Sequence, residues 1–128
     1  MRIANPWLLA AAISGLAAVV LGAVGWHGLD VNDAARDVFR AGVQYQMWHS
    51  LALLAVAWLA DGGERPKRAR WARVAGWCFA TGIVLFSGSL YGFAVTGAMP
   101  VPGAAPLGGV LLMAGWVALA VAAVLGGD

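Results

Sequence analysis

The chain has 128 residues, of which 62% are hydrophobic and only 11% are charged, and its formal net charge is +2. Soluble globular domains carry about 25% charged residues, so this composition excludes an ordinary water-soluble domain and indicates a membrane protein. The positive charge does not indicate nucleic-acid binding, because five of the eight basic residues lie in one short connector between apolar segments. The length is that of one domain, residues 1–128.

The first apolar segment covers residues 7–25 and is predicted to be a transmembrane helix. A cleaved signal peptide is the alternative interpretation. Only Arg2 precedes this segment, and its apolar core of about 18 residues exceeds the 7–15 residues of a typical signal. An uncleaved span is therefore favoured.

Residues 32–42 are predicted to form a short amphipathic helix between spans one and two. At about 100° per residue, Asp33, Arg36, Asp37, Arg40 and Gln44 share one narrow stripe. Small and apolar residues lie opposite. Such a helix either lies along the membrane surface or extends the second span, and its polar stripe is more typical of a wetted face than of a ligand site.

Three further apolar segments follow, at residues 43–60, 74–95 and 107–125. Each is close to the 20 residues that a helix needs to cross a bilayer. The connector 96–106 contains three prolines, which break helices, and no segment alternates as a strand would. The sequence therefore predicts an all-α membrane protein with four transmembrane helices.

Basic residues predict the orientation of these spans. Six of them lie at the N-terminus and in the 61–73 connector, whereas only Arg36 and Arg40 lie on the opposite side. Because the cytoplasmic loops of membrane proteins are richer in lysine and arginine, both termini are predicted to be cytoplasmic.

Several polar side chains are predicted to meet in the outer half of the bundle. Helical geometry directs Gln46 and His49 inward, and it places the polar part of span three at a similar depth. The fourth span has almost no polar side chain and is expected to form an apolar wall. The predicted cluster comprises His27, Gln46, His49, Ser87, Ser89 and Tyr91.

Two uses of this cluster are open. Interhelical hydrogen bonds would fix the order and register of the helices, or the same groups would form a site for a small molecule or proton. A metal or haem held by the two histidines is less favoured, because no carboxylate or thiolate accompanies them. No catalytic motif is present, so neither an enzyme nor a cofactor is expected.

Small residues at helical spacing are predicted to pack helices closely. They are Gly88 and Gly92 on span three, and Ala114, Ala118, Ala122 and Gly126 on span four. Packing within the chain is favoured, with part of the strip left for contacts between copies.

Four ordered motifs resemble the domain-of-unknown-function-423 family, bacterial relatives of transmembrane protein 256. They are LGAVGWHGL (21–29), YQMWHSLALL (45–54), LFSGSLY (85–91) and APLGG (105–109). The resemblance implies a small multi-pass protein of the bacterial inner membrane and no established activity. Trp26 and Ala105 depart from the family pattern, which has a small residue and a threonine there.

Three functions are compatible with these features. The first is a non-enzymatic accessory or scaffold protein that contacts the lipid bilayer and packs as a homo-oligomer or in a larger membrane complex. The second is a small oligomeric carrier or channel for a small molecule or proton. The third is a redox or metal-binding subunit that uses His27 and His49.

Overall fold

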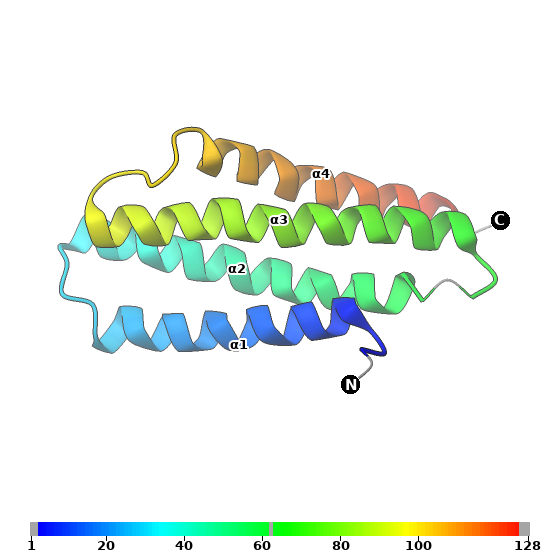
Figure 1. The fold of residues 1–128 in the computed structure, drawn as a ribbon, viewed down its shortest axis with the longest axis horizontal. Coiled ribbons are helices and arrows are strands. Elements are labelled where there is room, and N and C mark those ends of the chain that lie inside the picture. Colours follow the sequence, from blue (N-terminus) through cyan, green and yellow to red (C-terminus); the bar gives the residue numbers. More distant parts are fainter. Residues whose placement is uncertain (1–2, 62, 126–128) are drawn as a thin grey trace.

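The computed structural model describes residues 3–61 and 63–125, which form four long α-helices connected up and down (Figure 1). The helices are α1 (Pro6–His27), α2 (Asp33–Leu59), α3 (Pro66–Thr96) and α4 (Ala104–Val124). The predicted all-α class and the number of helices are confirmed.

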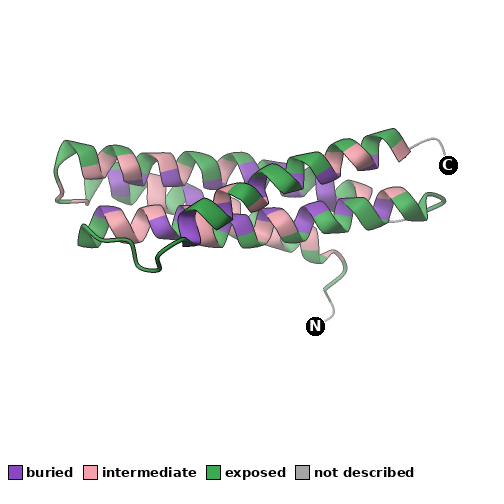
Figure 2. Cartoon of the chain, turned by 90° about the horizontal axis from the view of Figure 1, so that it is seen from above, coloured by how far each residue is buried: buried purple, intermediate pink, exposed green. Residues whose placement is uncertain are grey.

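The main helix contacts are between helices that are neighbours in the chain. α1 packs against α2, α2 against α3, and α3 against α4 (Figure 1). All four contribute to one apolar core, and the buried positions lie where helices face one another (Figure 2). The outer faces are apolar as well, with Leu16 of α1, Val84 of α3 and Val117 of α4 all exposed.

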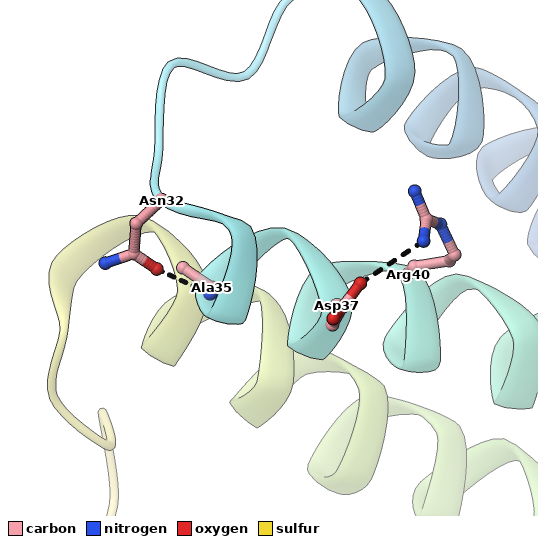
Figure 3. Close-up of polar contacts among 4 residues, drawn as sticks. All are labelled: Asn32, Ala35, Asp37 and Arg40. Atoms are coloured by element: carbon pink, nitrogen blue, oxygen red, sulfur yellow. Dashed lines mark hydrogen bonds and ion pairs between the residues drawn. The ribbon is translucent and has the colours of Figure 1, made fainter.

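Short polar side chains and glycine define the helix ends. The side chain of Asn5 accepts a hydrogen bond from the backbone N–H of Leu8 at the start of α1. Asn32 does the same for Ala35 at the start of α2, with a distance of 2.8 Å (Figure 3). α3 ends at Gly97, whose φ of 77° lies in the left-handed region that glycine adopts without steric cost.

Of the two arrangements predicted for the amphipathic segment 32–42, the structure shows the extension of the second span and not a separate helix. Residues 33–42 form the first turns of α2, which continues without a break for 27 residues. No bend forms near Gly42, because Gly42 is buried in the helix against the ring of Tyr91. The polar stripe is thus a straight extension of the second apolar segment.

Three of the four helices, α1, α3 and α4, are long and apolar enough to cross a membrane. α2 is long enough but falls short by composition, because its middle carries Gln44, Gln46 and His49. Of the four predicted spans, three are therefore confirmed as candidate spans. Because α2 packs between α1 and α3, its polar residues are within reach of both neighbouring helices.

Candidate functional site: two polar clusters between the helices

Gln46 lies at the centre of a hydrogen-bond network that joins three helices. Its side-chain amide donates to the carbonyl oxygen of Ser14 on α1 at 3.0 Å. Its amide oxygen accepts from the hydroxyl of Tyr91 on α3 at 2.6 Å. One turn further along α2, the hydroxyl of Ser50 lies 2.6 Å from that of Ser14. We call Ser14, Gln46, Ser50 and Tyr91 the glutamine network.

The side chain of Tyr91 reaches this network by passing over Gly42. Long side chains on a helix lean toward its N-terminus, so the tyrosine hydroxyl lies about one turn away from its own backbone. A Cβ atom at Gly42 would lie 2.7 Å from the ring, so a glycine is required there. Next to it, the hydroxyl of Ser87 donates to the carbonyl oxygen of Gly42 at 2.8 Å. These contacts bring the backbones of α2 and α3 close together.

His49 belongs to a second cluster, which joins α2 to α4. Its Nδ1 lies 2.6 Å from the carbonyl oxygen of Tyr45, and its Nε2 accepts from the indole N–H of Trp116 at 3.1 Å. This pattern defines the neutral imidazole with the proton on Nδ1, because an indole nitrogen only donates. The ring also contacts Phe79 on α3, with ring centroids 5.5 Å apart. We call His49 and Trp116 the histidine–tryptophan pair.

The structure brings together some of the predicted site residues and separates others. Gln46 and Tyr91 bond directly, and Ser87 lies beside them. Ser89 is buried but bonds to the carbonyl oxygen of Leu85 in its own helix, as serines in apolar helices commonly do. His49 bonds to none of the other predicted residues.

His27 lies apart from the rest. It is exposed in the last turn of α1, near the level at which Gly25 packs against Phe39 of α2. His49 is a further ten residues along α2, so the two histidines are separated by more than about 15 Å along the helix axis. The expectation that His27 and His49 meet in the outer half of the bundle is therefore wrong, because α2 begins ten residues before the predicted second span and His49 lies correspondingly deeper.

Sequence reasoning missed Ser14, Ser50 and Trp116. Ser50 follows Gln46 by four residues and therefore lies on the same face of α2, which was a usable signal. Trp116 belongs to the helix that was expected to be an apolar wall. It stands in the middle of an apolar segment, whereas five of the seven tryptophans lie near segment ends, where indoles prefer the headgroup region. That unusual depth was the available signal.

The glycines that pack helices are not the predicted ones. Gly88 is exposed, and a Cβ atom added there would have no neighbour within 4 Å, while Gly92 faces Pro100 of the following loop. Ala118 and Ala122 are buried as expected, Ala114 is exposed, and Gly126 lies outside the described residues. The close contact is instead at Gly108, where a Cβ would lie 2.5 Å from the backbone nitrogen of Phe86.

The chemistry open to these clusters is limited by their hydrogen bonds. In the described part of the chain, the buried side-chain nitrogen and oxygen atoms without a partner are the Nε atoms of Arg36 and Arg68, which belong to neither cluster. Nor do three histidine, cysteine, aspartate or glutamate side chains gather into a possible metal site among residues 3–61 and 63–125. Each side-chain nitrogen and oxygen atom of the two clusters thus has at least one hydrogen-bond partner within the chain.

A shallow hollow of about 370 Å³ lies beside the histidine–tryptophan pair, between α2 and α4. Its walls are mainly aromatic and apolar, formed by Tyr45, Trp48, Met113 and Trp116. The polar atoms of His49 are engaged by its two hydrogen bonds. This surface is suited to hydrocarbon rather than to a polar substrate.

Comparisons with known proteins agree on one family. A family model described as "Protein of unknown function (DUF423)" matches residues 21–109. The chain is 43% identical over 120 residues to the UPF0382 membrane protein YwdK of Bacillus subtilis (strain 168), which covers 92% of this chain and 95% of the relative. It is 36% identical over 119 residues to the UPF0382 inner membrane protein YgdD of Escherichia coli (strain K12), covering 91% and 88%. No solved structure shows a significant match.

Proposed function

The chain belongs to the DUF423 family, the UPF0382 membrane proteins, and from this membership and the two polar clusters we propose that it is a non-enzymatic accessory or scaffold subunit of the bacterial inner membrane. One observation carries the proposal. Every polar side chain of the glutamine network and of the histidine–tryptophan pair is bonded within the chain, so these groups hold helices together.

We further propose that α2 is the fourth transmembrane helix. It has 27 residues, or about 40 Å of helix, which exceeds the hydrocarbon thickness of about 30 Å. It lies between α1 and α3, both of which are apolar enough to span. Its polar residues Gln46, His49 and Ser50 are buried against these neighbours and against α4. A helix with such internal bonds avoids the cost of unpaired polar groups in lipid.

With four spans, both termini lie on the same side of the membrane. The connector between α2 and α3 and the start of α3 carry Arg65, Lys67, Arg68, Arg70 and Arg73, whereas the opposite end carries Arg36 and Arg40. This bias favours cytoplasmic termini. Reporter fusions after residue 125 and within residues 97–103 would test it, with a cytoplasmic signal expected only for the first.

An accessory subunit acts through its surface, and the surface within the membrane is broad and apolar. The 18-residue stretch that qualifies α1 as a span is only 11% buried within the chain. The alternatives require more of the interior: a carrier needs free polar groups along a path, and a metal subunit needs ligands that converge. The side-chain atoms of the two clusters are each bonded within the chain, and no three possible metal ligands gather among the described residues.

Photo-cross-linking in native membranes tests the accessory role. A photoreactive amino acid would replace Leu16, Val84 or Val117, which are 67%, 70% and 64% exposed on three different helices. We expect a protein adduct of defined mass, either with a second copy or with a larger subunit, from at least one position. Lipid adducts alone from all three positions would contradict the proposal. Haem absorbance that co-purifies with the protein would contradict it as well.

A further inference from the structure

Arg36 is an arginine whose charge has no counterpart within the described residues. Its Nη2 donates to the carbonyl oxygens of Leu29 and Val31, at 3.1 and 3.5 Å. Its Nε is buried and has no hydrogen-bond partner. Asp37, the following residue, is instead paired with Arg40 at 3.2 Å (Figure 3). In the part of the chain that the structure describes, Arg36 forms no ion pair.

A partly buried guanidinium of this kind is costly unless an anion accompanies it. Removing a charge from water costs several kcal/mol, and carbonyl dipoles offset only part of that cost. Arginine presents its N–H groups as a planar fork, which fits the oxygens of a phosphate or carboxylate. The guanidinium of Arg36, which has an unpartnered Nε and no ion pair among the described residues, therefore indicates a place for an external anion nearby.

The space for such an anion lies directly beside Arg36. A cavity of about 50 Å³ opens between Gly22, Gly25 and Trp26 of α1 and Arg36, Phe39 and Arg40 of α2. This volume accepts one or two groups the size of a water molecule, such as phosphate oxygens. Gly25 is required for the close fit, because a Cβ there would lie 2.8 Å from the ring of Phe39.

A second guanidinium and an indole complete the rim of the cavity. Arg40 extends from α2 on the side where α1 lies (Figure 3). Its guanidinium carbon lies 5.7 Å above the centre of the Trp26 ring. The cation–π contact and the ion pair with Asp37 hold Arg40 in place, and its remaining N–H groups stay available.

The depth of the cavity identifies the anion. If α2 crosses the bilayer, the 24 residues from Arg36 to Leu59 extend about 36 Å, slightly more than the hydrocarbon core of about 30 Å. Arg36 then lies at the level of the lipid headgroups, where exposed indoles such as Trp26 are also found. The anion present at that level in every bacterial membrane leaflet is a phosphate ester.

We propose that this cavity binds the phosphate of a membrane phospholipid, with the guanidinium groups of Arg36 and Arg40 as donors. The proposal rests on the four-span arrangement proposed above. Arg68 at the other end also has an unpartnered Nε, but the hollow beside it is lined by Asp61 and Glu64, which disfavour an anion.

Lipid binding to the purified full-length protein in detergent tests the site. The dissociation constant for phosphatidylglycerol would be measured by native mass spectrometry for the wild type and for Arg36→Gln. The matched control is Arg70→Gln, which removes an equal charge from an exposed position on α3. We expect Arg36→Gln to weaken phosphatidylglycerol binding about tenfold, which corresponds to about 1.4 kcal/mol, because it removes a charged hydrogen-bond donor. Arg70→Gln is expected to leave the binding unchanged.

A lipid without phosphate and a second variant provide further tests of the site. Equal binding of diacylglycerol, which lacks the phosphate, would overturn the proposal, as would equal affinity of the wild type and Arg36→Gln. Should Arg36→Gln fail to fold, Arg40→Gln keeps the bonds of Arg36 to the loop and is expected to weaken binding as well. An unchanged affinity in that variant would overturn the role of Arg40 and the two-donor site.

Binding of soluble glycerol phosphate tests the lipid site separately from the four-span arrangement on which it rests. Tight binding of glycerol phosphate without acyl chains would overturn the lipid as ligand and would place Arg36 in water, against α2 as a span. Loss of lipid binding together with intact protein cross-links would overturn only the phosphate site.

Discussion

The contact between α1 and α2 and the contact between α3 and α4 are built in different ways. α1 is attached to α2 by polar bonds at two levels, Asn5 to the carbonyl of Ala57 and Ser14 to Gln46 and Ser50. α4 is attached to α3 mainly by shape. In lipid, helices gain little from burying apolar surface against each other, so they associate through hydrogen bonds or through close packing. In this molecule, hydrogen bonds join α1 to α2, and close packing joins α4 to α3.

The α3–α4 contact depends on glycines that admit large neighbours. A Cβ at Gly82 would lie 2.6 Å from the side chain of Leu112, and one at Gly115 would lie 2.5 Å from the ring of Phe79. At Gly108 the neighbour is the backbone of Phe86, which cannot rotate away. The α1–α2 contact is therefore expected to be sensitive to the loss of polar groups, and the α3–α4 contact is expected to be sensitive to added bulk.

The largest effect is expected from Gly108→Ala. The added methyl group would lie 2.5 Å from the backbone nitrogen of Phe86, and such overpacking costs about 3 kcal/mol. Gly109→Ala is the matched control, because its nearest neighbour in Phe86 is 3.8 Å away. Thermal unfolding in detergent measures both. Equal stability of the two variants would show that α3 and α4 separate without cost.

A smaller effect is expected from Gln46→Leu, which preserves size but removes both side-chain bonds. The hydroxyl of Tyr91 would be left in the interior without its acceptor, at a cost of about 2 kcal/mol. Gln44→Leu is the control, since Gln44 is exposed, two residues away on the same helix. If Gln44→Leu destabilised the protein as much as Gln46→Leu, the glutamine network would not be what joins α1 to α2 and α3.

The smallest effect is expected from Trp116→Phe. It retains most of the aromatic surface and removes the N–H that His49 accepts, at a cost of about 1 kcal/mol. Trp48→Phe serves as the control, because Trp48 is exposed and lies on the other wall of the same hollow. The ¹⁵N shift of His49 Nε2 should change only in the Trp116 variant. An unchanged shift would contradict the bond.

Much of the fold could be predicted from hydrophobic patterning. The number of helices was right, and helical angles correctly turned Gln46 and His49 inward and Gln44 outward. The ends were less accurate. α3 begins eight residues before the predicted span, at Pro66, because its charged first two turns are helical although they are not apolar. Hydropathy identifies what lies in lipid and not where a helix begins.

The partners within the clusters could not be predicted. A helical angle gives the face on which Gln46 lies, but the identity of its neighbours depends on how three helices are arranged in space. The same angle places His49 on the buried face without indicating that α4, rather than α1, provides its partner. Gly108 was missed for a related reason, since its role depends on the backbone of Phe86, which no local pattern reports.

The composition of α2 bears on the order in which the protein is built. On leaving the ribosome, α2 follows α1 and precedes α3, so Ser14 is already present when Gln46 emerges and Tyr91 is not. A segment too polar to enter lipid alone would have one of its two partners at that moment. If α2 crosses the membrane as proposed, its stable insertion would wait for the synthesis of α3, and the first three helices would be inserted as a unit before α4.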